Sequence, residues 1–168
     1  PLPQNVACAD RGQFYQQYIF LEVPATLTVS GFAATINFLE IDSLDNLPCG
    51  IAARFDEPSQ RYNGGETGCL ELYGTTIDPV GQYDLGLFVT LSVTLPGFGT
   101  QEFSGRADDL IQQLEDFAGP LGINFSYWIR VKNQSASCPS IDTSGATNLS
   151  SSCTPLQAGF SGLSCDGA

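Results

Sequence analysis

Six cysteines are the residues with the clearest chemistry in this chain of 168 residues, which contains no histidine. An even number of cysteines without a C-x-x-C pair is typical of disulfides that persist outside the reducing cytosol. The absence of histidine excludes Ser-His-Asp and Cys-His nucleophiles and histidine-ligated zinc. The sequence therefore predicts a secreted, disulfide-bonded protein that has no cofactor and is not an enzyme.

The spacing of the cysteines suggests how they pair. Cys49 and Cys69 bracket a loop whose closure contributes about 3 kcal/mol in the chain-entropy model, so we predict a structural disulfide between them. The other four cysteines then allow three pairings, among which we favour the following: Cys8 with Cys138, and Cys153 with Cys165.

Clustered acids offer a second kind of chemistry. Asp42, Asp45 and Asn46 in one turn, or Asp56 and Glu57 beside a second loop, would supply oxygen ligands to calcium. Neither run has EF-hand spacing, so we favour solvated turn residues and expect no metal site. A carboxylate pair for glycoside hydrolysis needs a separation of about 5 to 10 Å, which a sequence cannot show.

Trp128 is the single tryptophan of the chain and lies in an expected strand. Alternation along residues 124–131 places Tyr127, Ile129 and Val131 on one face and Trp128 on the more polar face. Such a tryptophan either stacks on a sugar or a neighbouring molecule, or packs beneath a helix, and we favour packing.

Charge and composition exclude several partners. The formal net charge is −12 and the six basic residues are scattered. The sequence therefore lacks the cluster of basic residues that binding of nucleic acid or anionic lipid requires. No run approaches the roughly 20 apolar residues of a membrane span. The first residues, which lack methionine and signal-peptide features, are expected to be a mature N-terminus. Three glycan acceptor motifs begin at Asn124, Asn133 and Asn148.

The patterning predicts a mostly β fold. Residues 14–23, 25–41, 69–74, 83–95 and 123–131 are rich in β-branched and aromatic residues with period-two alternation, and turn signals separate them at 42–48 and 57–65. Such spacing favours an antiparallel Ig-like sandwich over βαβ units. The fold is expected to occupy residues 1–133, and a Ser-, Gly- and Cys-rich tail, pinned by disulfides, to occupy 134–168.

One segment, 106–118, has helical spacing instead. Leu110, Ile111, Leu114 and Phe117 repeat at helical intervals, and Gly119 and Pro120 then supply stop signals. We predict an amphipathic helix that packs as a lid on the sandwich. The alternative is that Leu110, Leu114 and Phe117 form an interface with a partner.

Several segments together resemble a known family. Residues 12–24 are similar to the opening strand of the Ig-like domains in secreted proteins of Bacteroidota, residues 41–50 resemble their leucine-proline-glycine turn, and residues 68–75 with 80–85 resemble their glycine-cysteine, glycine-threonine and glycine-x-tyrosine signature. The resemblance covers about residues 8–132. It implies an extracellular β-sandwich exported by the Sec route, often followed by a type IX secretion sorting domain, with no catalytic residues to carry over.

These observations favour a non-enzymatic structural or adhesive subunit at the cell surface that assembles with copies of itself into a filament or layer. The alternative is a secreted carbohydrate-binding module, or a carboxylate-dependent domain acting on glycans, built on Trp128 and acidic loops. The expected partners are therefore other copies of the chain or surface glycans, without nucleic acid and without membrane insertion.

Overall fold

The computed structural model describes residues 6–29, 31–118, 120, 126–144, 148–151, 156–157 and 159–160. Strands dominate them, and the single helix of these residues is α1. In chain order the elements are β1 (Ala9–Asp10), β2 (Phe14–Glu22), β3 (Thr26–Val29), β4 (Phe32–Asp45), β5 (Ile51–Phe55), β6 (Arg61–Asn63), β7 (Thr67–Thr75), β8 (Gly81–Leu95), β9 (Gly99–Arg106), α1 (Ala107–Ala118), β10 (Tyr127–Lys132), β11 (Asn148–Leu149), β12 (Leu156–Gln157) and β13 (Gly159–Phe160).

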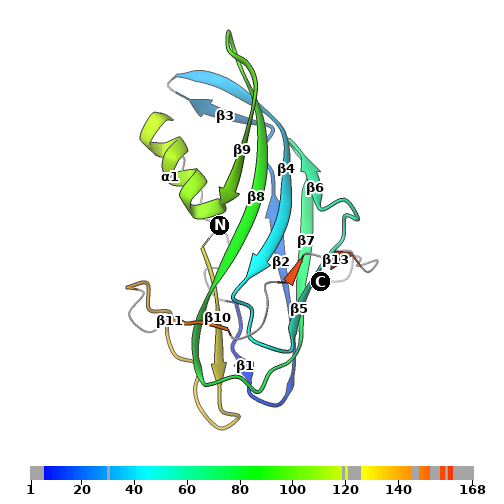
Figure 1. The fold of residues 1–168 in the computed structure, drawn as a ribbon, viewed down its shortest axis with the longest axis vertical. Helices are drawn as coiled ribbons and strands as arrows, with labels where there is room; N and C mark the ends of the chain where they lie inside the picture. Colours follow the sequence, from blue (N-terminus) through cyan, green and yellow to red (C-terminus); the bar gives the residue numbers. More distant parts are fainter. Residues whose placement is uncertain are drawn as a thin grey trace.

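Two sheets pack against each other in an elongated molecule (Figure 1). The larger sheet has the order β1-β10-β8-β4-β12, with β3 and β6 also on β4 and with β9 and β11 also on β8. The smaller sheet has the order β13-β5-β7-β2. The apolar core lies between them, because alternate residues of β2, β4, β7 and β8 point inward and are buried. The predicted mostly β fold of packed sheets is thus confirmed.

The long strand β8 is the spine of the larger sheet. One of its edges pairs with β10 along residues 81–85 and with β9 along 88–95. The opposite edge pairs with β11 at Gln82 and Tyr83 and with β4 from Gly86 to Thr94. Both edges therefore change partner at about the same place, between Asp84 and Phe88.

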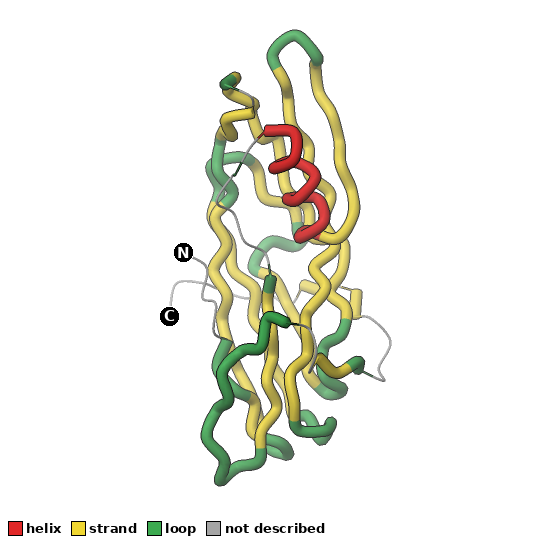
Figure 2. Tube along the Cα trace, turned by 90° about the vertical axis from the view of Figure 1, so that its left-hand side faces the viewer, coloured by secondary structure: helices red, strands yellow, loops and turns green. Residues whose placement is uncertain are grey.

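Helix α1 confirms the helix predicted for 106–118. Asp108 and Asp109 lie in its first turn, where they complement the helix dipole. Leu110 is buried in the core and Leu114 packs partly against it, so the helix covers one end of the larger sheet. Figure 2 shows α1 lying beside the sheet at the end where the β8–β9 hairpin extends beyond the rest of the molecule.

Two predicted loops contain strand residues. The segment 42–48 was expected to be a turn, but β4 continues to Asp45 and the turn begins at Asn46, which has a φ of 57°. A register shift between Ile41 and Ser43 lets the exposed Asp42 accept a hydrogen bond from Thr90. The expected loop 57–65 contains β6, which pairs with β4. In both cases pairing with a neighbouring strand overrides polar local sequence.

Two segments that are far apart in the sequence, residues 6–10 and 138–139, meet at β10. A disulfide joins Cys8 to Cys138 with a Cα–Cα distance of 5.8 Å, as predicted. Beside it β1 pairs with β10 in parallel, and the Lys132 ammonium binds the Asp10 carboxylate. Arg130, only 5% exposed, donates to the carbonyl oxygens of Val6 and Pro139. This buried cation thus ties both segments to the sheet.

The predicted disulfide between Cys49 and Cys69 is wrong. Thr75 N donates to Gly50 O at 3.2 Å, which places Cys49 at the end of β7 near Thr75. Cys69 lies six residues away along the same strand, about 20 Å at the usual rise, whereas bonded cysteines have Cα atoms within about 7 Å of each other. Both residues are nevertheless disulfide-bonded. The predicted pairing of Cys153 with Cys165 falls outside the described residues.

We expect a non-reducing peptide map to recover Cys8 linked to Cys138 and no peptide that links Cys49 to Cys69. Because the chain has six cysteines, Cys49 and Cys69 should each be recovered with a peptide from the segment after Ser151. Recovery of a Cys49–Cys69 link would contradict the strand register described above.

A buried carboxylate lies on the outer side of the smaller sheet. Glu71 of β7 has no exposed surface and accepts hydrogen bonds from Arg54 and Gln16. Arg54 also lies over the ring of Tyr73, 4.6 Å from its centre. Burial alone would raise the pKa of Glu71, but the hydrogen bonds from Arg54, Gln16 and Tyr18 outweigh it and hold the pKa below its ordinary value of 4.5.

We predict that Glu71→Gln lowers the free energy of unfolding at neutral pH by roughly 1 to 2 kcal/mol. Breaking a fully buried pair costs about 3 to 5 kcal/mol, and Arg54 is partly exposed, which lowers the cost. A lowered pKa stabilises the fold above the ordinary pKa and loses this effect as the pH falls through the shifted value, so variant and native protein should converge in acid. Urea unfolding at several pH values measures the difference.

The matched control is Glu40→Gln, since Glu40 pairs with Arg61 on the exposed surface. Its effect should stay below about 1 kcal/mol. Equal losses for the two variants would contradict a special role for Glu71.

Candidate functional site

A polar cleft of about 430 Å³ lies where β8 changes partners. The described residues that line it come from the end of β4, the middle of β8, the end of β9, and β11 with the residues that follow it. They are Asp45, Asn46, Asp84, Arg106, Asn148, Leu149, Ser150 and Ser151. Because four strands begin or end here, their polar end residues gather in one place.

Arg106 is the cation of this cleft. Its Nη2 donates to Asp84 Oδ2 at 2.9 Å, and its Nε donates to Asp108 Oδ1 at 2.8 Å. Partial burial raises the pKa of Asp84, Arg106 opposes that shift, and the nearby Asp108 and Asp45 add to it. Burial by itself would lower the pKa of Arg106, but the carboxylates beside it raise it. The guanidinium therefore stays charged between acids that outnumber it.

Asp45 is the second carboxylate of the cleft. It lies opposite Gly86 in the β4–β8 pairing, and a Cβ on Gly86 would overlap Asp45 Oδ1. That oxygen is buried and has no hydrogen-bond partner in the described part of the chain. The next residue, Asn46, donates to the carbonyl oxygens of Asp84 and Leu149 and accepts from Ser151 N, so it fastens the segment after β11 to β8.

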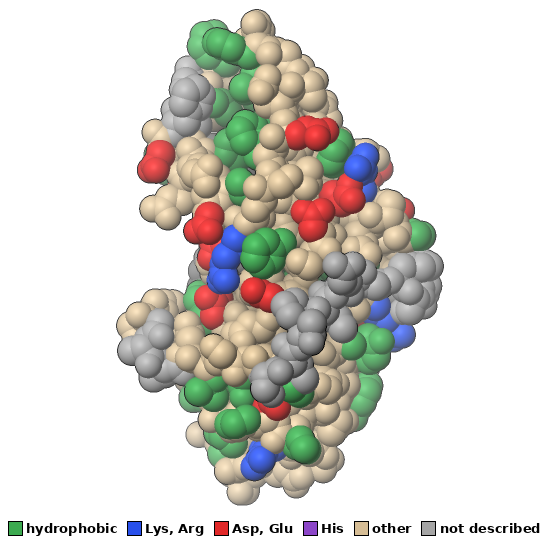
Figure 3. All heavy atoms as spheres, viewed as in Figure 1, with side chains coloured by type: hydrophobic (Ala, Val, Ile, Leu, Met, Phe, Trp, Pro, Cys, Tyr) green, Lys and Arg blue, Asp and Glu red, His purple; other side chains and the backbone are tan. Residues whose placement is uncertain are grey.

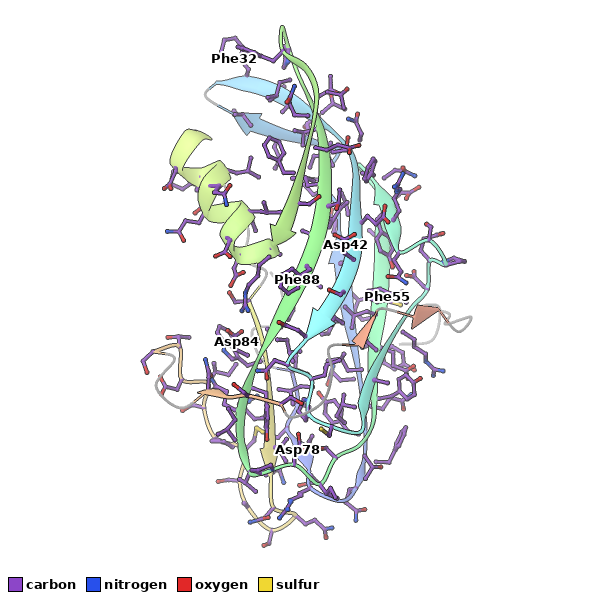
Figure 4. All side chains as sticks on the ribbon, in the orientation of Figure 1. Phe32, Asp42, Phe55, Asp78, Asp84 and Phe88 are labelled. Carbon is purple, nitrogen blue, oxygen red and sulfur yellow. A yellow bond between two sulfur atoms is a disulfide. The ribbon has the colours of Figure 1, made fainter. Side chains whose placement is uncertain are left out.

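Trp128 lies next to the cleft, directly across the β10–β8 pairing from Asp84 (Figure 4 labels Asp84). The predicted alternation is confirmed, since Tyr127, Ile129 and Val131 are buried inward. Trp128 is half-buried, and its indole Nε1 has no partner in the described residues. Gln82 holds the wall of the cleft with Nε2 bonds of 2.7 Å to Asp142 O and Asn148 Oδ1.

The cleft is suited to binding. It offers carboxylate, amide and hydroxyl groups that can form hydrogen bonds with a polar ligand, and Trp128 lies on the neighbouring strand. Hydrolysis by a carboxylate pair needs one acid with a raised pKa and one ionised partner. The pKa of Asp84 is raised, but its carboxylate is already paired with the Arg106 guanidinium. In the described ranges, no group of three or more His, Cys, Asp and Glu side chains is arranged for a metal ion.

The other predicted site residues lie apart from the cleft or belong to the scaffold. Leu110 and Leu114 face the core, and the side chain of Phe117 lies outside the described residues. Asp42 is on the outer face of β4, as Figure 4 shows. Asp56 accepts hydrogen bonds from Tyr62 Oη at 2.7 Å and from Cys69 N at 3.1 Å, so it is a structural acceptor.

Sequence reasoning identified Asp45, Asn46 and Trp128 but missed Asp84 and Arg106. Asp84 is a lone acid inside a long apolar strand, and Arg106 is a lone cation just before the helix. Asp84 breaks an otherwise uncharged stretch, and this was the available signal, whereas Arg106 lies between Glu102 and Asp108 and gives no such signal. Their meeting depends on the pairing of β8 with β9, a strand that the alternation did not predict.

Comparison with protein-family models, with curated proteins and with solved structures gives no match. Among the described residues no helix has the length and apolar character needed to cross a membrane.

Proposed function

We propose that this protein is a non-enzymatic, extracellular structural or adhesive subunit with an Ig-like sandwich fold, which assembles with copies of itself at a cell surface. The disulfide between Cys8 and Cys138 supports an oxidising location. Asp84 and Asp108, the two carboxylates beside Arg106, are used in ion pairs, which favours a structural role over catalysis. The observation that carries the proposal is the character of the β8–β9 hairpin.

The β8–β9 and β3–β4 hairpins are uncharged toward their tips. Residues 23–39 and 85–101 contain no Asp, Glu, Lys or Arg, although the chain carries a net charge of −12. Phe32 and Phe98 in these hairpins are 65% and 80% exposed. Figure 3 shows hydrophobic side chains gathered at this end, whereas acidic side chains lie across the middle of the same face. Exposed aromatic rings without charge mark an interaction surface.

The outer edge of β9 adds a second reason. Within the described residues β9 pairs with β8 alone, and most of its residues are exposed. Proteins that stay monomeric usually protect such edges with lysine, proline or a bulge. The charged residues of β9 are Glu102, which is exposed, and Arg106, which forms ion pairs with Asp84 and Asp108. A long, weakly protected edge on an uncharged hairpin favours association with another copy of the chain.

We expect sedimentation velocity to show association that grows with protein concentration and does not depend on added cofactors. Gln101→Glu places a charge on the β9 edge and should raise the dissociation constant by about tenfold or more, since it adds a negative charge to a contact between copies that are both acidic. Gln13→Glu makes the same charge change before β2 and should leave association unchanged. A native protein that stays monomeric at all concentrations would contradict the assembly.

A carbohydrate-binding module is the second candidate, and the cleft beside Trp128 favours it. If glycans bind there, a glycan array should give a signal with the native protein that Asp84→Asn and Asp45→Asn each reduce. Asp42→Asn, on the outer face of β4, is the matched control and should keep the signal. Signals that are absent, or equal in the three variants, would contradict this candidate.

A further inference from the structure

The polar cleft is built around a glycine of β8. Gly86 lies opposite Asp45 of β4, and the Asp45 carboxylate occupies the space that a side chain at Gly86 would fill. The nearest residues on the same face of β8 are Asp84 and Phe88, both labelled in Figure 4. Phe88 in turn lies opposite Arg106 of β9. The strand register therefore gathers two carboxylates, a guanidinium group and an aromatic ring around Gly86.

Asp45 is the carboxylate of this cleft that lacks a hydrogen-bond partner. Its Oδ1 is buried without a donor, and no group of the described residues donates to its Oδ2. Because Asp45 lines the cleft, Oδ2 is the oxygen through which it can bind a ligand. A carboxylate that is partly removed from water without a donor costs free energy. A donor supplied by a ligand would recover that cost.

The cleft carries more negative than positive charge. Arg106 donates to Asp84 Oδ2 and to both oxygens of Asp108, so two carboxylates share one guanidinium group. Asp45 is a third carboxylate, and Arg106 is the one cation of the described lining. Partial burial raises the pKa of Asp84, Arg106 lowers it, and repulsion from Asp108 and Asp45 raises it again. A cationic ligand would relieve this repulsion, whereas the net charge of −12 disfavours an anion.

The geometry narrows the kind of cation. A metal ion needs several oxygen ligands that converge, and the described residues contain no suitable group of three acids. A guanidinium group binds best to both oxygens of one carboxylate, but Asp45 Oδ1 is buried and Asp84 Oδ2 is used by Arg106. Each carboxylate therefore offers a single oxygen. An ammonium group is a compact charge with three donors, so single oxygens from separate carboxylates suit it.

The size of the cleft and the composition of the chain indicate where the ammonium group comes from. A volume of about 430 Å³ lies within the usual range for small-molecule sites, about 300 to 1,000 Å³. The single lysine of the sequence, Lys132, binds Asp10 and is not available to a second copy. The ligand is therefore a different molecule.

We propose that this cleft binds an organic ammonium group, which donates hydrogen bonds to the free oxygens of Asp45 and Asp84. Two sources carry this chemistry, a free diamine and a lysine side chain of another protein. Binding of either one goes beyond the proposed structural role and does not depend on self-assembly, because the uncharged hairpin tips lie elsewhere on the molecule.

Two ligands that differ in charge provide the first test. Putrescine and 1,4-butanediol have the same carbon chain, with ammonium and hydroxyl groups respectively at its ends. In NMR titrations of ¹⁵N-labelled protein, putrescine should shift the amide signals of Asn46, Gly86 and Ser150 with a dissociation constant on the order of 1 mM. A salt concentration of about 0.15 M screens weak attraction to other surface acids. Equal shifts with butanediol would overturn the inference.

Variants at the cleft provide the second test. Asp45→Asn keeps the shape of the side chain and removes its charge, so putrescine should bind about tenfold more weakly. Asp42→Asn removes the same charge from the exposed face of β4, and this matched control should bind like the native protein. If Asp45→Asn lowers the melting temperature, Gly86→Ala takes its place, because it keeps every charge and displaces the Asp45 carboxylate. Native affinity in a folded Asp45→Asn variant would contradict the site.

Further ligands separate the sources and the alternatives. A short peptide with one lysine that binds more tightly than putrescine and loses binding on acetylation would assign the site to a partner protein, and the reverse order would assign it to a free amine. Calcium that displaces putrescine, or a neutral glycan that binds with the same dependence on Asp45, would overturn the inference. Absence of putrescine binding would leave self-assembly in place, and a monomeric native protein that binds putrescine would overturn self-assembly alone.

Discussion

Hydrogen bonding along both edges of β8 is the constraint on which the rest of the structure depends. The strand holds β9 and β4 at one end and β10 and β11 at the other, so it joins the uncharged hairpin end to the part where the two chain segments meet. Because β8 changes its paired strands on both edges at about the same position, the ends of several strands lie close together there. Those ends supply the polar residues of the cleft, and Gly86 leaves space for Asp45.

The proposed assembly and the fold have a common physical origin. At the end with the β8–β9 hairpin, the larger sheet is covered by α1 and not by the smaller sheet. A single helix does not fill the space that a sheet would fill. The same shortfall exposes the hairpin tip. A surface of this kind would promote disordered aggregation in many proteins, but the net charge of −12 carried by the rest of the chain would oppose contacts outside the uncharged hairpin tips.

Alternation and helical spacing in the sequence correctly predicted the elements that bury one face. The alternation of Tyr127, Ile129 and Val131 and the helical spacing of Leu110 and Leu114 were sufficient, because burial of one face governs both. Pairings distant in sequence were not accessible, and this is why Cys49 was assigned to Cys69 and why β4 was ended too early. Asp84 and Arg106 illustrate a different limit: β9 was not predicted as a strand, and the two residues become a site only through the β8–β9 register.

The parallel pairing of β1 with β10 beside the Cys8–Cys138 bond determines how the molecule carries mechanical load. Tension applied to the chain before Cys8 and after Cys138 passes through one covalent bond, and the 130 positions that separate the two cysteines are bypassed. If that bond is reduced, the same tension shears β1 along β10, so all of their hydrogen bonds must break together and not one after another. A subunit linked to its neighbours on both sides would therefore stretch little under force while oxidised.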